Sequence, residues 1–151
     1  MEGSRVAPPR EFEGLLDKLC DKPPLGLALF ESKQKVLMFA AALGCHRQRR
    51  EKVERRGEAI RIEVFQRSAD EGFVDALAVA ATGDLHVLGD DRLTERITIF
   101  EEYAHGGLIE LQRLADSGHP LEDLVRVVQE GQFAADTAIP GVDPGVLALL
   151  S

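Results

Sequence analysis

Apolar positions recur at helical spacing along the first third of the chain. Phe12, Leu15, Leu16 and Leu19 follow the i, i+3, i+4, i+7 pattern of an amphipathic helix. This helix is expected from Arg10 to Cys20, before Pro23 and Pro24 prevent its continuation. A second helix is expected over residues 33–43, with Ser32 as its N-cap and Gly44 as the glycine that terminates it. Because this second helix is apolar on nearly every side, we expect it to be buried.

The spacing of apolar residues changes in the middle of the chain. Ile60, Ile62 and Val64 alternate with charged residues, which predicts a short strand. Residues 85–88 (Leu-His-Val-Leu) are the best candidate for its partner. Between them, residues 68–71 (Ser-Ala-Asp-Glu) have the form of a capping box that opens a helix through Ala81, and Gly83 and Asp84 follow its end.

The longest helical pattern begins after Asp90 and Asp91 and continues to Leu114. Gly106 and Gly107 lie inside it, where two glycines cost about 2 kcal/mol relative to alanine. Either the helix breaks there, or a neighbouring backbone approaches closely. Pro120 then begins a last helix that extends to about Gln132.

These elements predict a mainly α, single compact domain of about five helices, with room for one short two-stranded β-ribbon. We expect residues 1–10 to form a flexible N-terminus and residues 11–132 to form the helical domain, with a basic loop at 45–57. Residues 133–151 form an Ala/Gly/Pro-containing tail.

Composition fits a globular protein: 44% of the 151 residues are hydrophobic and 29% are charged. The two cysteines cannot form a disulfide framework and suit a reducing compartment. The longest apolar run, residues 36–43, is far too short to span a membrane, and the N-terminus lacks the apolar stretch of a secretory signal. We therefore expect a soluble cytoplasmic protein.

Charge is distributed unevenly. The chain carries a net charge of −8, yet residues 45–57 hold six basic and two acidic side chains, whereas residues 58–151 hold six basic and eighteen acidic ones. Such a protein repels phosphate everywhere except near the basic segment, residues 45–57.

The basic segment is the strongest candidate site. Its arginines suit bidentate phosphate contact, and the absence of aromatic residues argues against stacking on single-stranded bases. The predicted DNA-backbone contacts are Arg47, Arg49, Arg50, Lys52, Arg55 and Arg56. Two alternatives remain open: the segment could meet an acidic protein partner, or its arginines could pair with the acidic helices of this same chain.

Other chemistry finds little support. Glu102 and His105 have the E-x-x-H spacing of carboxylate-bridged metal sites, but the only further candidate is the weak pair Asp116 and His119, so we predict no metal. Tyr103 beside the two glycines could form a recognition notch, although packing of those glycines against Ala40 to Ala42 is the preferred interpretation.

Nucleophilic and cofactor chemistry is also not indicated. The side chains of Cys45 and His46 diverge, and Cys20 fits helix packing. Neither a P-loop nor a dinucleotide fingerprint is present, so we predict no cofactor and no enzymatic activity.

Three stretches together resemble the Dnd system-associated protein 4 family. They are residues 35–44 with the basic segment that follows, residues 57–65 (Gly-Glu-Ala-Ile-Arg-Ile-Glu-Val-Phe), and residues 97–108, which contain Tyr-Ala-His-Gly-Gly. The resemblance covers about residues 12–130, and the prolines at 23–27 and the C-terminal tail depart from it. It implies a setting beside bacterial DNA phosphorothioation systems, which replace a non-bridging phosphate oxygen with sulfur, and hence antiviral defence and restriction-modification. The family offers no catalytic residues to transfer.

From these observations we predict an accessory, non-catalytic factor that contacts the DNA backbone through the basic segment. The alternative is an adaptor that docks onto larger modification or restriction proteins through the apolar tail, residues 133–151.

Overall fold

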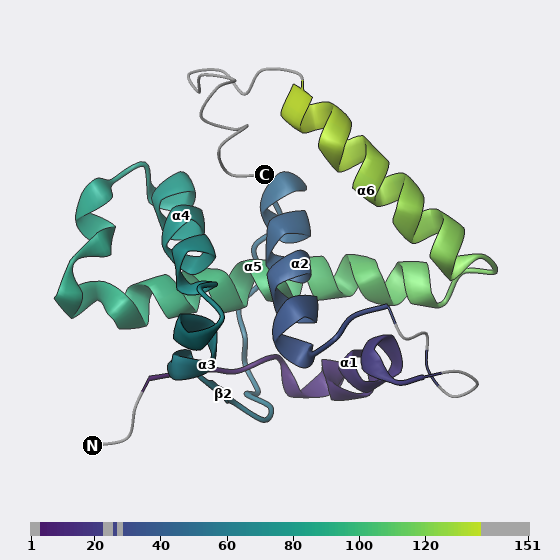
Figure 1. The fold of residues 1–151 in the computed structure, drawn as a ribbon, viewed down its shortest axis with the longest axis horizontal. Coiled ribbons are helices and arrows are strands. Elements are labelled where there is room, and N and C mark those ends of the chain that lie inside the picture. The colour runs from purple at the N-terminus through teal and green to yellow at the C-terminus, as the bar shows by residue number, and fades with distance from the viewer. Residues whose placement is uncertain (1–3, 23–25, 27–28, 137–151) are drawn as a thin grey trace. The chain divides into compact units, whose positions relative to one another are not determined.

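The computed structural model describes residues 4–22, 26 and 29–136, with residues 130–136 described by their backbone alone. The chain divides into two compact units, residues 1–111 and 112–151. The fold is mainly α, as expected, with six α-helices and a small two-stranded sheet among the described residues (Figure 1). No helix within the described ranges is long and apolar enough to cross a membrane.

The second helix shows how the chain turns into the basic segment. Helix α2 (Lys33–His46) begins as predicted, because Ser32 Oγ accepts a hydrogen bond from the Lys35 backbone N–H at 3.3 Å. It does not end at Gly44, which lies within the helix. The left-handed residue after α2 is Gln48 (φ 54°), and the Gln48 and Arg49 N–H groups donate to the carbonyls of Cys45 and Gly44. This is the Schellman arrangement, with glutamine where glycine is usual.

The longest helix is unbroken through its two glycines. Helix α5 (Leu93–Ala115) crosses α2 (Figure 1), and the backbones meet at glycine on both sides. A Cβ on Gly107 would overlap the Ala40 carbonyl, and a Cβ on Gly44 would overlap the Tyr103 carbonyl. A Cβ on Gly106 would overlap the carbonyl of Arg49. The preferred interpretation, helix packing, is therefore confirmed, and backbone fills the space that a recognition notch would need.

The two-stranded ribbon forms with a partner that the sequence did not indicate. Strand β2 (Ile60–Arg61) pairs antiparallel with β1 (Arg5–Val6), rather than with residues 85–88. Of the N-terminal residues, Arg5 and Val6 thus form a strand, and Val6 and Ala7 are buried. Further along, the Gly57 N–H donates to the Pro8 carbonyl, and the Arg10 N–H donates to the Arg55 carbonyl. After the ribbon, residues 10–12 form a 3₁₀ turn (η1) and α1 covers Glu13–Cys20.

The expected strand at 60–64 is wrong beyond Arg61, because the chain enters helix α3 (Ile62–Arg67) at once. Its alternating apolar residues also fit a short helix, in which Ile62 and Phe65 face the core. Phe65 packs edge-on against Phe100 of α5, with ring centroids 5.6 Å apart. Helix α4 (Glu71–Thr82) follows, with Asp70 rather than Ser68 as its N-cap, and ends at Gly83 in the left-handed conformation.

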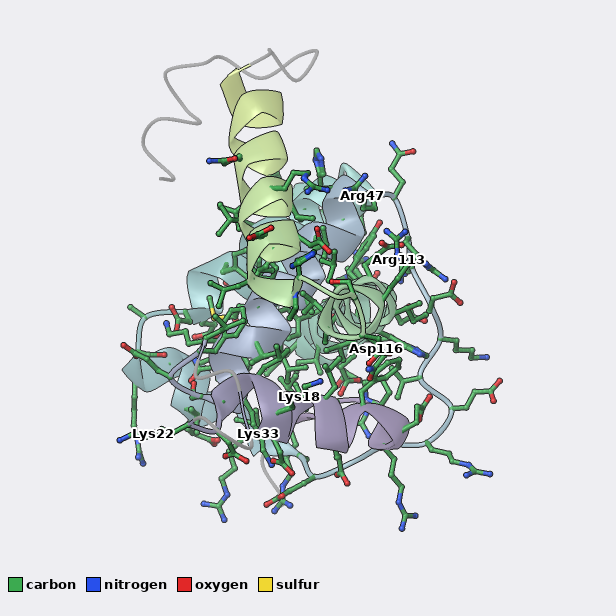
Figure 2. The ribbon with its side chains drawn as sticks, turned by 90° about the vertical axis from the view of Figure 1, so that its right-hand side faces the viewer. Lys18, Lys22, Lys33, Arg47, Arg113 and Asp116 are labelled. Carbon is green, nitrogen blue, oxygen red and sulfur yellow. The ribbon has the colours of Figure 1, made fainter. Side chains whose placement is uncertain are left out.

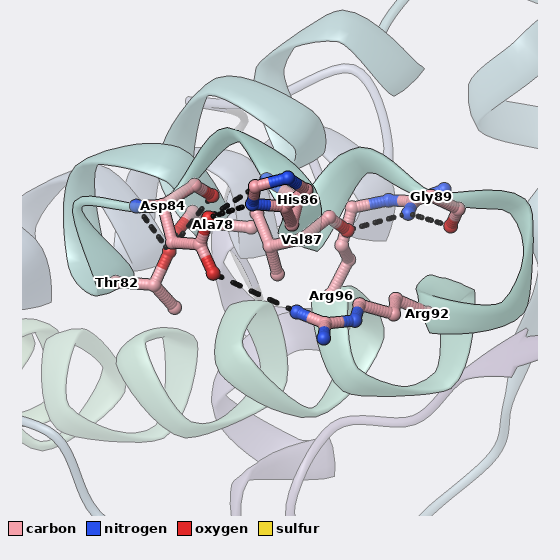
Figure 3. Close-up of polar contacts among 8 residues, drawn as sticks. All are labelled: Ala78, Thr82, Asp84, His86, Val87, Gly89, Arg92 and Arg96. Carbon is pink, nitrogen blue, oxygen red and sulfur yellow. Dashed lines mark hydrogen bonds and ion pairs between the residues drawn. The ribbon is translucent and has the colours of Figure 1, made fainter.

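Residues 85–88, expected to be a strand, form a 3₁₀ helix (η2) fixed by a buried arginine. Arg96 Nη1 donates to the carbonyls of Val87 and Gly89 at 2.8 and 2.9 Å (Figure 3). Arg96 Nε lies 2.9 Å from Asp75 Oδ1 of α4, so one side chain joins η2, α4 and α5. At the start of η2, the His86 backbone N–H binds Asp84 and lowers the pKa of that carboxyl. A second 3₁₀ turn (η3, Asp90–Arg92) leads into α5.

In the second unit, helix α6 covers Pro120–Asp136. Pro120 is its first residue, as predicted. Among its apolar side chains, Leu121, Val125 and Val128 are exposed and follow the i, i+4, i+7 spacing of one helix face.

Replacing Gly107 with alanine tests the helix crossing. The added Cβ has no space beside the Ala40 backbone, so we expect a loss of about 1–3 kcal/mol in the free energy of unfolding, measured by chemical denaturation. Gly72→Ala in α4 is the matched control: nothing lies within 4 Å of the added Cβ, and alanine should stabilise that helix by up to about 1 kcal/mol. Equal, small effects at both positions would contradict the close crossing.

Candidate nucleic-acid interface

The basic segment lies along α5 as an irregular strap. From Arg47 it runs beside the helix, with side chains projecting from it (Figure 2). Its backbone is bound to α5 at two points, because the Glu51 N–H donates to the Glu102 carbonyl at 3.1 Å and His105 Nδ1 lies 2.9 Å from the Lys52 carbonyl oxygen. His105 also packs edge-on against Phe12, with ring centroids 5.7 Å apart. The path of the segment is thus set by α5.

Two arginines of the segment reach carboxylates of α5. Arg49 Nη1 lies 3.0 Å from Glu110 Oε1. Arg50 Nη2 lies 2.8 Å from Glu102 Oε1, and its guanidinium carbon is 5.6 Å from the centre of the Tyr103 ring. Both glutamate side chains are less than a fifth exposed, so these pairs are screened less than ordinary surface pairs.

The third pair is the most buried. Arg56 Nη1 lies 2.7 Å from Oε1 of Glu101, whose side chain is only 4% exposed. The other carboxylate oxygen of Glu101 accepts the backbone N–H of Ala7. Burial raises the pKa of Glu101, while these two donors act in the opposite direction. Glu101 therefore joins the basic segment and the N-terminal strand to the middle of α5.

The six cations predicted to contact DNA thus divide into two groups. Arg49, Arg50 and Arg56 are paired within the chain, and Arg47 also interacts with another residue. Lys52 and Arg55 are exposed, and neither side chain has a partner among the described residues. Internal pairing, one of the alternatives left open by the sequence, therefore applies to part of the segment, and the DNA contact itself stays a prediction.

Sequence reasoning missed Glu101, the residue that organises this site. Glu101 follows Ile97 by four residues and precedes Ala104 by three, so its place on the apolar stripe of the helix was a signal for its burial. A second signal was the charge imbalance, since a basic segment followed by an acidic helix favours pairing between them.

The other candidate residues serve the same packing. Glu102 and His105, which have metal-site spacing, both hold the basic segment, through Arg50 and the Lys52 carbonyl. Within the described ranges no group of three His, Cys, Asp or Glu side chains is placed to hold a metal ion. Burial raises the pKa of both thiols, Cys20 and Cys45, which disfavours the nucleophilic thiolate.

Replacing Arg56 with glutamine tests the buried pair. The change leaves the Glu101 carboxylate with only the Ala7 N–H as a partner, so we expect a loss of about 1–3 kcal/mol in the free energy of unfolding. Arg55→Gln is the matched control next to it, and should change stability by less than about 0.5 kcal/mol because Arg55 has no side-chain partner among the described residues. An unchanged free energy of unfolding for Arg56→Gln would show that the Arg56–Glu101 pair does not stabilise the fold.

The raised pKa of Glu101 also predicts a pH dependence. Its carboxyl binds a proton more readily in the folded chain than in the unfolded chain, so stability falls as the pH rises from 4.5 through the folded-state pKa. Glu101→Gln removes this titration. The stability of the original chain relative to this variant should therefore decline as the pH is raised from 4.5 towards neutrality, measured by denaturation at several pH values. If the original chain instead became more stable relative to the variant over that pH range, the raised pKa of Glu101 would be contradicted.

The comparisons with known proteins agree with the residues that suggested a relationship. No curated protein and no solved structure matches the chain significantly. The sequence does match a family described as DNA sulphur modification system-associated protein 4, and the match extends over residues 5–139, which include the ribbon, the basic segment and α5. The chain therefore belongs to the DNA sulphur modification system-associated protein 4 family.

Proposed function

We propose that this protein is a non-catalytic accessory factor of a DNA sulphur modification system that contacts the DNA backbone. The membership of the family supports the setting. The observation that carries the contact is the pair of exposed cations, Lys52 and Arg55, which the fold presents without internal partners among the described residues. Antiviral defence and discrimination of sulphur-modified DNA are further predictions from the resemblance.

The division of labour within the basic segment follows from its ion pairs. Arg49, Arg50 and Arg56 hold the segment on α5 and neutralise three glutamates that would otherwise repel phosphate. The side chains of Arg50 and Arg56 are still about half exposed, at 43% and 52%. Lys52 and Arg55 thus extend from a segment whose contacts with these three glutamates of α5 are already compensated in charge. Contact of this kind recognises the backbone and carries no sequence readout.

A second candidate, the protein adaptor, is favoured by a different observation. The exposed apolar face of α6, formed by Leu121, Val125 and Val128, is suited to contact with another protein. The tail at 133–151, which the sequence indicated for this role, lies outside the residues whose side chains are described. Docking onto modification or restriction proteins through α6 and the tail is compatible with a DNA contact elsewhere on the chain.

Neutralising Lys52 and Arg55 tests the proposed function. We expect Lys52→Gln with Arg55→Gln to weaken binding to a short labelled duplex, and to make the slope of log affinity against log salt shallower by about 2, because two phosphate contacts are lost. The weakening should be similar for duplexes of different sequence. Fluorescence anisotropy at several salt concentrations measures both quantities.

Lys18→Gln with Lys22→Gln is the control, since it also removes two positive charges, one from α1 and one from just after that helix. Lys22 lies on the opposite side of the view from the basic segment in Figure 2. Equal slopes for the two double variants would exclude Lys52 and Arg55 as phosphate contacts. If the unaltered chain binds no duplex at low salt, the DNA contact is wrong and the adaptor is the remaining candidate.

A further inference from the structure

The antiparallel ribbon and the residues that continue its pairing form two ribbon segments, residues 5–10 and 55–61, with arginines at both ends. Arg5 of β1 stands directly opposite Arg61 of β2. At the other end, the backbones of Arg10 and Arg55 are joined by a hydrogen bond of 2.9 Å. Arg56 lies between the two ends, and its Nη2 donates to the Arg5 carbonyl at 3.4 Å. Three of these arginines, at positions 5, 10 and 61, lie outside the basic segment and come to it only through the pairing of the strands.

These arginines have no counter-charge in the described part of the chain. Arg5, Arg10, Arg55 and Arg61 are exposed, and none forms an ion pair or a side-chain hydrogen bond with another described residue. Glu58 is the one acidic residue within the two ribbon segments, and its Oε2 lies 4.0 Å from Lys33 Nζ. Of the flanking carboxylates, Glu11 lies near His105, and Glu54 and Glu63 pair with none of the ribbon arginines.

The opposed pair at one end is unfavourable for the isolated protein. Like charges that face each other directly across two antiparallel strands repel and destabilise the sheet. Here the repulsion is not relieved by an internal carboxylate. An external anion that bridges Arg5 and Arg61 removes it, so the ribbon is arranged for a ligand that carries negative charge.

We propose that this ribbon is a preformed binding element for the phosphate backbone of duplex DNA, with Arg5 and Arg61 as its outer contacts and Arg10 and Arg55 as its inner ones. The proposal rests on the DNA contact proposed above and extends it to three residues outside the basic segment. The two arginine pairs are five residues apart along the N-terminal chain, a separation of at most roughly 16 Å. Over that length a duplex presents roughly nine phosphate charges, enough to occupy both pairs.

The chemistry of the ribbon favours a phosphate backbone over an acidic protein. Protein interfaces are organised around apolar or aromatic side chains that become buried at their centre. The apolar ribbon residues Val6, Ala7 and Pro9 are already buried in this fold, so the ribbon offers charge without an apolar centre. Four arginines match the bidentate geometry of phosphate oxygens, and they have the spread that a repeating polyanion requires.

Neutralising the opposed pair tests this inference. With Arg5→Gln and Arg61→Gln, we expect duplex affinity to fall less steeply with salt than for the unaltered chain. Two lost contacts reduce the slope by about 1.8. The ratio of the duplex affinity of the unaltered chain to that of the variant should therefore fall about twelvefold between 50 and 200 mM salt. The same variant should melt at an equal or higher temperature, because the repulsion between the two arginines is removed.

Lys18→Gln with Lys22→Gln again serves as the control of equal charge. A salt slope equal to that of this control would overturn the ribbon contact, while loss of binding in the Lys52 and Arg55 variant would still uphold the proposed function. A lower melting temperature for the Arg5 and Arg61 variant would show that these arginines serve the fold, and would also overturn the inference. Absence of duplex binding by the unaltered chain would overturn both proposals.

Discussion

The close crossing of α2 and α5 is the constraint on which the rest of the structure depends. Gly44 of α2 and Gly107 of α5 let the two backbones meet without an intervening side chain, and Gly106 leaves space for the carbonyl of Arg49. The same contact decides where the basic segment goes, because the turn at Gln48 directs the Arg49 carbonyl onto Gly106. From there the carboxylates of α5 can reach the arginines of the segment. These packing contacts therefore place the most basic part of the chain against the carboxylates of α5.

That placement has two consequences for charge. The buried carboxylate of Glu101 binds both Arg56 and the Ala7 backbone, and so holds the N-terminal strand and the end of the basic segment together. The ribbon that results gathers arginines from two distant parts of the sequence. Internal pairing and external binding are thus compatible: the paired arginines position the segment and cancel the glutamates beneath it, and the unpaired ones face outwards in a protein whose net charge is negative.

Helices with a clear apolar stripe or cap could be predicted from the sequence. Ser32, Gly83 and Pro120 marked helix ends correctly, because each acts through its own backbone or a neighbour in the chain. The errors arose where distant contacts decide. Residues 85–88 are apolar enough for a strand, but Arg96 donates to the carbonyls of Val87 and Gly89, and the segment forms a 3₁₀ helix. Gly44 looked like a helix end, yet its missing side chain serves the contact with α5. For the same reason local charge pointed to the candidate site, but the carboxylates that pair with its arginines and the placement of Arg5 opposite Arg61 could not be predicted.

The central claim is that the arginines held by α5 and the arginines left free have different roles. Nuclear magnetic resonance of the arginine side-chain Nε–H groups, during titration with a short DNA duplex, tests it directly. The account predicts that the signals of Arg5, Arg10, Arg55 and Arg61 shift on binding, while those of Arg49 and Arg56 stay in place because their carboxylate partners remain bound. Shifts at Arg49 and Arg56 with none at the ribbon arginines would contradict it.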